Sequence, residues 1–168
     1  NIKDKYLAQL ATKKVGAYCL SEASSGSDAF ALKASAKEVG NHYILNGAKL
    51  WITYANEADI FIVFATVNPE AGYKGISAFV VERSFEGFSV AKKEDKLGIR
   101  GSSTATITFE DCKVPKDQLL GKPGEGFKVA MTTLDGGRIG IAGQAIGIAQ
   151  ASLDCATAYA LQRCAYKI

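Results

Sequence analysis

Apolar residues first recur at helical spacing and then alternate at strand spacing along most of the chain. Ile2, Tyr6 and Leu10 lie on one face of a short amphipathic helix expected over residues 2–11. From about residue 17 onward, short alternating or apolar runs are separated by turn residues, a pattern typical of β-strands. The pattern therefore predicts one helix followed by a β-rich region.

The β-rich region divides into several candidate strands. Residues 59–67 are a continuous apolar run and predict a central buried strand, whereas residues 68–75 predict a loop. Gly40-Asn41 and Asn46-Gly47 are two-residue hairpin signals. The other candidate strands cover residues 30–37, 42–45, 50–53, 76–81, 88–91 and 104–109. Strands this short, with turns this frequent, predict a single closed β-barrel of short antiparallel strands.

Helical patterns return after Pro115. One helix is expected over residues 125–134, and residues 135–137 (Asp-Gly-Gly) are expected to interrupt it. A long helix is expected over residues 138–166, apolar on more than one face, so it requires packing partners outside these residues. The predicted fold class is mainly β with flanking α: a closed β-barrel, a short N-terminal helix and a long C-terminal helix.

Composition narrows the class of protein. The 168 residues, 48% of them hydrophobic and 22% charged, suit one globular domain with an attached helical piece. The formal net charge is only +3 and no basic stripe occurs, so nucleic acid is not an expected partner. The longest apolar run, residues 139–153, is too short to span a membrane. The first residues lack the apolar stretch of a signal peptide, and we expect a soluble protein with no targeting segment in this chain.

Cysteine and histidine usage argues against a metal centre. The four cysteines form no C-x-x-C pair and His42 is the only histidine, so we expect no metal site. Reduced thiols in a reducing compartment are the expectation for such cysteines. A Ser–His–Asp triad is also disfavoured, because His42 alone would have to serve in it.

Three segments carry ligand-binding residue types, and each has a structural alternative. Residues 18–28 predict a strand that runs into a loop of small hydroxyl residues, which suits either a phosphate or polar ring edge, or a solvated turn. Trp51 is either a packing residue or a platform for a flat cofactor, with Thr53 at the ring edge. Residues 135–138 are either a helix N-cap with a flexible joint, or a ligand contact in which Arg138 pairs with an anionic group.

Several motifs together resemble the acyl-CoA dehydrogenase family over nearly the whole chain. They are C-L-S-E-x-x-S-G-S-D over residues 19–28, W-I-T over 51–53, K-L-G-I-R-G-S-S-T over 96–104, G-E-G-F over 124–127 and G-R over 137–138. The segments Y-C-L-S-E-A-S-S-G-S-D and G-Y-K-G-I-S-A-F-V-V-E-R look most like the short/branched-chain members. The resemblance implies three parts: residues 1–16 as the end of an N-terminal helical domain, 17–115 as a middle β-barrel, and 116–168 as a linker with the start of a C-terminal helical domain.

The resemblance also implies a cofactor, FAD, and an acyl-CoA substrate. The residues implied to contact FAD are Tyr18, Cys19, Leu20, Ser21, Gly26, Ser27, Trp51, Ile52, Thr53 and Arg163. Those implied to line the acyl-CoA channel are Ser27, Tyr73, Phe127, Asp135, Gly136, Gly137 and Arg138. The chain departs from the family's Arg-x-Gln-Phe-Gly pattern after Arg163, where it reads Cys-Ala-Tyr-Lys.

By resemblance, the parent enzyme oxidises an acyl-CoA to its trans-2-enoyl-CoA and passes electrons to an electron-transferring flavoprotein. The family's general base is a glutamate with no counterpart here, so no catalytic residue is assigned and Glu22 is not given that role. The resemblance further implies a homotetramer in the mitochondrial matrix of a eukaryote, or in the cytoplasm otherwise. These residues alone are expected to be inactive. The alternatives are a non-catalytic isolated barrel domain, or an acyl-CoA oxidase or enoyl-CoA reductase on the same scaffold.

Overall fold

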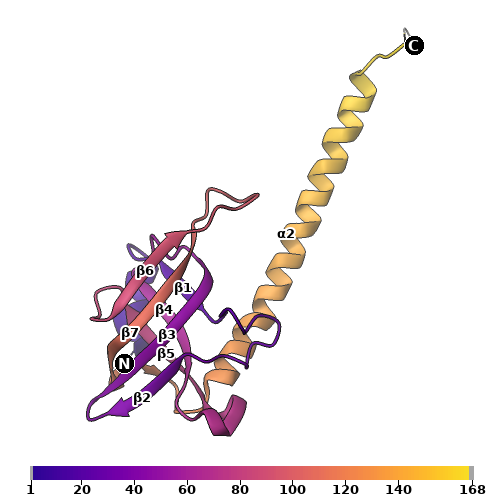
Figure 1. Cartoon of the computed structure of the whole chain (residues 1–168). Coiled ribbons are helices and arrows are strands. Elements are labelled where there is room, and N and C mark those ends of the chain that lie inside the picture. Colours follow the sequence, from indigo (N-terminus) through magenta and orange to yellow (C-terminus); the bar gives the residue numbers. More distant parts are fainter. Residues whose placement is uncertain (1, 167–168) are drawn as a thin grey trace. The chain divides into compact units, whose positions relative to one another are not determined.

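The computed structural model describes residues 2–166, which divide by contacts into one unit up to Val129 and a second from Ala130 onward. Figure 1 follows the chain through both. The elements are α1 (Ile2–Leu10), β1 (Gly16–Cys19), β2 (Ser35–Val39), β3 (His42–Thr53), β4 (Ile60–Thr66), η1 (Pro69–Gly75, a 3-10 helix), β5 (Ile76–Glu82), β6 (Phe88–Lys93), β7 (Thr104–Pro115), η2 (Lys116–Gln118, a 3-10 helix), β8 (Leu119–Leu120) and α2 (Gly126–Gln162).

All the strands of the first unit belong to one curled sheet (Figure 1). Hydrogen bonds join them in the order β6-β7-β3-β2-β4-β5-β8, and β1 pairs in parallel with β4. Strand β2 also meets β4 in parallel, at Ser35 and Thr66, while the other pairs are antiparallel. The predicted closed barrel of antiparallel strands is therefore wrong in two respects. The sheet is mixed, and within residues 2–166 no hydrogen-bonded pairing joins its end strands β6 and β8.

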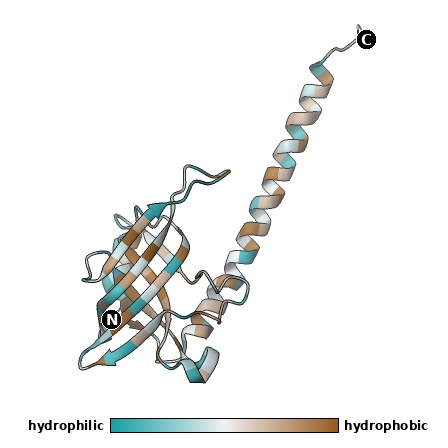
Figure 2. Cartoon of the chain, in the orientation of Figure 1, coloured by the Kyte–Doolittle hydropathy of each residue, from teal (hydrophilic) through white to brown (hydrophobic). Residues whose placement is uncertain are grey.

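The core lies inside the curl of the sheet. Strand β4 is buried along almost its whole length, as the apolar run of residues 59–67 predicts, because both faces of the sheet are covered there. On the outer face, Tyr6 of α1 packs against Ile60 and Val80, and its hydroxyl donates a hydrogen bond of 2.6 Å to the Glu82 carboxylate. Figure 2 shows apolar and polar residues alternating along several strands of the sheet, whereas β5 is buried along most of its length. The inner face is filled by Leu45, Ile52, Phe61, Phe79, Ile107 and Phe109, with smaller residues between them.

The Gly40-Asn41 turn is confirmed, but the hairpin predicted at Asn46-Gly47 is wrong. Strand β3 runs straight through these two residues, opposite a bulge in β7 at Asp111. The Asn46 amide donates to the Asp111 carboxylate and the Asp111 N–H donates to the Asn46 side-chain oxygen, both at 2.9 Å. Gly47 has a φ of +136°, and a Cβ there would lie 2.9 Å from Ala34. The pair thus serves a bulge and a close approach rather than a turn.

Three other expectations about local structure are wrong in part. The strand expected over residues 30–37 begins only at Ser35, and the loop expected over 68–75 contains η1. Helix α2 continues through Asp135-Gly136-Gly137 without interruption. Glycine lowers helix stability by about 1 kcal/mol without preventing the helical conformation, so flanking helix-forming residues outweigh it. Within residues 2–166, neither helix is long and apolar enough to cross a membrane.

The start of α2 is packed tightly against η1 and β5, and glycine makes this possible. The Gly124 N–H donates to the Ser77 hydroxyl at 2.9 Å, and a Cβ on Gly124 would lie 2.5 Å from the Lys74 carbonyl oxygen. A Cβ on Gly126 would lie 2.7–2.8 Å from backbone atoms of Ile76 and Ser77. These contacts explain why G-E-G-F has glycines at both positions.

We predict that Gly126→Ala destabilises the first unit, because backbone atoms cannot move aside as a flexible side chain can. Overpacking of this kind typically costs about 1–3 kcal/mol. The matched control is Gly98→Ala, since a Cβ there meets nothing within 4 Å. Urea unfolding should show a lowered midpoint for Gly126→Ala and an unchanged one for Gly98→Ala. Equal midpoints for the two variants would contradict the packing described for α2.

Candidate functional site

The loop after β1 is anchored beside β3 by backbone hydrogen bonds. The Leu50 N–H donates to the Ser21 carbonyl at 2.9 Å, which places Ser21 next to the strand segment that contains Trp51. Glu22 and Ser25 exchange backbone hydrogen bonds of 2.9 and 3.1 Å, so the loop closes on itself. The Ser25 hydroxyl is buried against the Asp28 carbonyl. Gly26 and Ser27, by contrast, are exposed at the tip of the loop. The segment is thus an ordered turn rather than a freely solvated one.

A buried ion pair holds this loop against the sheet. Lys49 of β3 is fully buried, and its Nζ donates to Glu22 Oε1 at 2.6 Å and to the Leu20 carbonyl at 3.1 Å. The Glu22 carboxylate also accepts hydrogen bonds from the backbone N–H groups of Lys33 (2.7 Å) and Ala34 (3.1 Å). Burial lowers the pKa of Lys49, while the hydrogen bond and charge of Glu22 oppose that shift. The contacts of Glu22 described here are therefore structural.

Trp51 lies on a bulge of β3 and points out of the core. Lys49 pairs with Ile107 and Ile52 pairs with Ala105, so two residues of β3 oppose a single residue of β7. Trp51 has a φ of +61°, an unusual conformation for a bulky residue, and its side chain is 62% exposed. The exposure of Trp51 excludes packing in the core, whereas surface packing and a cofactor platform both stay open. An aromatic face held out by a strained backbone is a feature that clusters at binding sites.

The residues before the loop differ in what they can offer a ligand. The Tyr18 ring contacts Phe64 edge-on with 5.1 Å between centroids. Its hydroxyl is buried without a hydrogen-bond partner in the described structure, and burial raises the pKa of Tyr18 to about 12. The side chains of Cys19 and Leu20 are buried in the protein, so only their backbone groups are available to a ligand. Burial raises the pKa of the Cys19 thiol, which disfavours thiolate chemistry there.

Three aromatic rings from distant segments meet in the first unit. Phe127, at the start of α2, lies 4.6 Å from Phe30 and 4.9 Å from Tyr73 of η1, measured between ring centroids. Tyr73 and Phe127 were both predicted to line the acyl-CoA channel, and the structure brings them together. The sequence analysis missed Phe30. The available signal was a large aromatic residue closing a segment otherwise made of small residues.

Thr53, the last residue of β3, is exposed and pairs with Thr104 of β7. The other predicted residues not yet described belong to the second unit: Asp135, Gly136, Gly137, Arg138 and Arg163. Arg138 forms an ion pair of 2.7 Å with Asp135, one helical turn earlier, and both side chains are largely exposed. Gly136 and Gly137 have open space around them within this chain. The Arg163 guanidinium donates to the Cys164 carbonyl at 2.9 Å. These contacts are local, so they leave the predicted roles of these residues as predictions.

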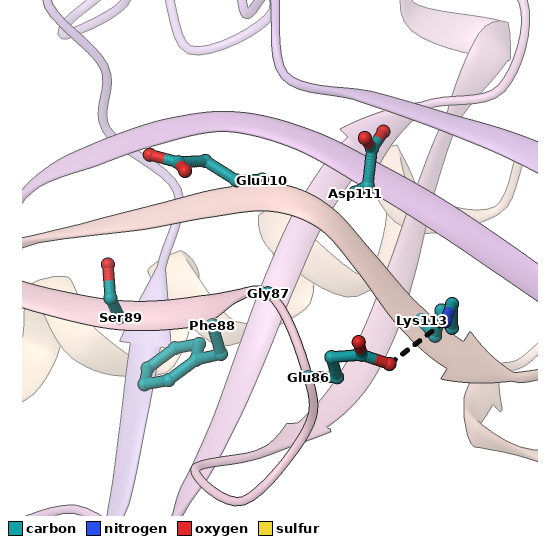
Figure 3. A pocket seen from close by; sticks show the side chains of 7 residues that line it. All are labelled: Glu86, Gly87, Phe88, Ser89, Glu110, Asp111 and Lys113. Atoms are coloured by element: carbon teal, nitrogen blue, oxygen red, sulfur yellow. Dashed lines mark hydrogen bonds and ion pairs between the residues drawn. The ribbon is translucent and has the colours of Figure 1, made fainter.

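A separate hollow of about 370 Å³ lies between β6 and β7, and its lining is shown in Figure 3. Glu86 and Lys113 form an ion pair of 2.9 Å across it, with side chains 77% and 56% exposed. Its remaining lining residues are Gly87, Phe88, Ser89, Glu110 and Asp111, and none of the predicted ligand-binding residues is among them.

The first unit is thus a β-sheet unit with a loop anchored on β3, an outward-facing Trp51 and aromatic contacts at Phe127. Residues 17–112 match the family profile "Acyl-CoA dehydrogenase, middle domain", and residues 124–167 match "Acyl-CoA dehydrogenase, C-terminal domain". The chain belongs to the acyl-CoA dehydrogenase family.

Two rat proteins illustrate the relationship. The chain is 57% identical over 153 residues to the short-chain specific acyl-CoA dehydrogenase, mitochondrial, of Rattus norvegicus. It is 50% identical over 161 residues to the short/branched chain specific acyl-CoA dehydrogenase, mitochondrial, of the same organism. The alignments cover 91% and 96% of this chain, but in both cases only 37% of the relative's length. The resemblance predicted from the motifs is confirmed.

Solved structures agree with the fold. A chain in a structure described as the electron transferring flavoprotein of Acidaminococcus fermentans matches with a TM-score of 0.94 and 51% identity, covering 98% of this chain and 44% of that one. An acyl-CoA dehydrogenase complexed with FAD from Bacillus anthracis matches with a TM-score of 0.92 and 42% identity, covering 98% and 29%.

The bulge of β3 leads to a prediction about stability. Replacing the large Trp51 by Ala should change the free energy of unfolding by only about 0.5 kcal/mol, as for other surface positions. Replacing the smaller Ile52 by Ala should cost about 2–5 kcal/mol, because Ile52 is buried. Urea unfolding of the two variants, both without ligand, tests this order. A larger loss for Trp51→Ala would mean that Trp51, not Ile52, faces the core.

Proposed function

We propose that this chain is part of a flavoenzyme that oxidises an acyl-CoA to a trans-2-enoyl-CoA. The observation that carries the proposal is the juxtaposition of Trp51 and Ser21: the bulge exposes an aromatic face one residue from the point where the loop is hydrogen-bonded to β3. A flat heteroaromatic ring needs both an apolar surface to pack on and polar groups at its edge. Trp51 supplies the surface, and Ser21 and the exposed Thr53 supply hydroxyls.

The residues present fit FAD, the cofactor in the name of the B. anthracis structure. Ser21, Trp51 and Thr53 would hold the flavin ring, with backbone groups of Cys19, Leu20 and Ile52 behind them. The unpartnered hydroxyl of Tyr18 provides a buried polar atom that a ligand would satisfy. Gly26 and Ser27 would face the cofactor from the loop tip, and Arg163 would reach the FAD of a neighbouring subunit. When bound, FAD supplies the hydride acceptor.

On the substrate side, Tyr73 and Phe127 would form an apolar wall for the acyl group together with Phe30. Ser27 would contribute a polar contact. By family resemblance alone, Asp135 to Arg138 are also proposed to contact the acyl-CoA, with Arg138 as the cation for an anionic group. The general base lies outside these residues by family resemblance, and the role of this chain is to bind and orient.

The wider context is also a proposal, because the chain spans about two-fifths of its relatives' length. The three-part division at residues 1–16, 17–115 and 116–168 is supported by the separate matches over 17–112 and 124–167. An electron-transferring flavoprotein as electron acceptor is consistent with the name of the A. fermentans structure. A homotetramer follows from family resemblance alone. The rat relatives' names support a mitochondrial location in a eukaryote, more specifically the matrix, and a cytoplasmic one is proposed otherwise.

The test is to purify the protein from its whole reading frame, record its visible spectrum and add short straight or branched acyl-CoA. We expect a yellow protein that bleaches on addition of substrate and passes electrons to a dye or to an electron-transferring flavoprotein. Direct consumption of O₂ would instead indicate an oxidase. A requirement for a reductant and an enoyl-CoA would indicate a reductase. A colourless protein that does not take up FAD would indicate a non-catalytic domain.

Within the same protein, Trp51→Ala should weaken FAD binding and alter the flavin absorption and fluorescence spectra. Loss of a stacked ring removes on the order of 1 kcal/mol, or about fivefold in Kd. Val39→Ala is the matched control, since Val39 is an exposed apolar residue at the opposite end of the β2–β3 hairpin from Trp51. An unchanged Kd and spectrum for Trp51→Ala would remove Trp51 from the proposed cofactor site.

A further inference from the structure

We propose that the Glu22–Lys49 ion pair is a positioning device that sets the signature loop and the bulged segment of β3 against each other, so that Ser21 and Trp51 meet the same ligand. The inference rests on the proposed function, since it concerns the flavin-facing side of that site. Glu22 and Lys49 are positioning residues: they are buried behind the groups proposed to touch the ligand, and they act through those groups.

The ion pair connects both ends of the loop to one residue of the sheet. Lys49 Nζ reaches the start of the loop through the Leu20 carbonyl and the Glu22 carboxylate. The same carboxylate accepts the N–H groups of Lys33 and Ala34 at the end of the loop. The segment between these two ends includes the serine-rich tip proposed to face FAD. A single pair of charges thus determines where the loop starts, where it ends and how it lies on β3.

The same bulge directs both Lys49 and Trp51. In a regular strand, residues two apart share a face, so Lys49 and Trp51 would both point inward. Because the bulge begins directly after Lys49, Lys49 stays inside while Trp51 is turned outward. Between them, Leu50 donates its N–H to the Ser21 carbonyl at 2.9 Å. Any shift of Lys49 would therefore be transmitted to Trp51 along the strand and to Ser21 across the hydrogen bonds.

Physical chemistry favours positioning over simple stabilisation. Burying two charges costs so much desolvation that an apolar pair of similar volume is often equally stable. Contacts between apolar side chains, however, have no preferred direction, whereas the hydrogen bonds of the Lys49 ammonium and the Glu22 carboxylate form only in a few geometries. Three backbone groups converge on the pair: the Leu20 carbonyl on Lys49, and the N–H groups of Lys33 and Ala34 on Glu22. This arrangement is expected where geometry, rather than stability, is required.

The test uses the protein expressed from its whole reading frame, with three variants: Glu22→Gln, Lys49→Met and the double variant. Glu86→Gln and Lys113→Met are matched controls, because this pair has a similar separation of 2.9 Å but is exposed. In FAD-free protein, hydrogen exchange at the amides of Lys33 and Ala34 should speed up about tenfold in Glu22→Gln, in line with the loss of a hydrogen bond to a charged group. The controls should leave these two amides unchanged.

The second readout is the flavin itself. We expect each single variant to weaken FAD binding at least about tenfold and to shift the flavin spectrum, with the two effects non-additive in the double variant, as for residues that act as one unit. The double variant removes both charges and so should fold as stably as the wild type. The flavin spectrum of the double variant should nevertheless stay shifted from that of the wild type. If the ion pair only stabilised the fold, a double variant of wild-type stability would have the wild-type spectrum.

The possible outcomes distinguish failure of the positioning role from failure of the proposed function. A double variant with wild-type stability, exchange and flavin spectrum would overturn the proposal. A double variant that fails to fold would also overturn it, because the pair would then hold the fold itself. If the wild-type protein takes up no FAD, the proposed function fails, and hydrogen exchange alone decides whether the pair orders the loop. Wild-type FAD binding with unaffected variants would overturn only the positioning role.

Discussion

Strand β3 satisfies a constraint that regular β-structure cannot meet: Lys49 and Ile52 both face the interior although they are three positions apart. Side chains alternate across a strand, so one of the two would have to face outward in the absence of a bulge. The bulge resolves the conflict by placing two residues of β3 opposite one residue of β7. It leaves Trp51 exposed with a positive φ. The anchoring of the loop, the exposure of the aromatic face and the filling of the core all depend on this local irregularity.

The proposed site is built from segments that are distant in the sequence and meet only in the folded chain. The loop after β1 is held on β3 by Glu22 and Lys49, which are far apart in sequence. The aromatic contacts of Phe127 join the end of that loop to η1 and to the start of α2. Glycines at 124 and 126 allow this approach because any side chain would collide with backbone atoms of η1 and β5. In this chain, the two glycines of the G-E-G-F motif are thus required by packing.

Several elements were predictable because the signal was local. The apolar run of residues 59–67 became a buried strand, Gly40-Asn41 became a hairpin turn, and Ile2–Leu10 became a helix. The failures were also systematic. Asn46-Gly47 and Asp135-Gly136-Gly137 carry strong local preferences, but the first was used for a bulge and a close approach, and the second lies inside a continuous helix. Local preferences amount to about 1 kcal/mol per residue, which hydrogen bonding and packing of the surrounding element readily exceed.

The sequence by itself determined the family and the β-rich region flanked by helices, and it singled out the loop and tryptophan segments of the proposed site. These depend on motifs and on the spacing of apolar residues. Only the tertiary structure decided that the sheet is mixed and open, that Trp51 faces outward, and that Lys49 lies buried against Glu22. The physical reason is that strand partners, bulges and buried ion pairs are set by contacts between residues distant in sequence. The sequence around a lysine in a strand does not show whether the lysine is buried, because its burial requires a carboxylate that is brought beside it only by the fold.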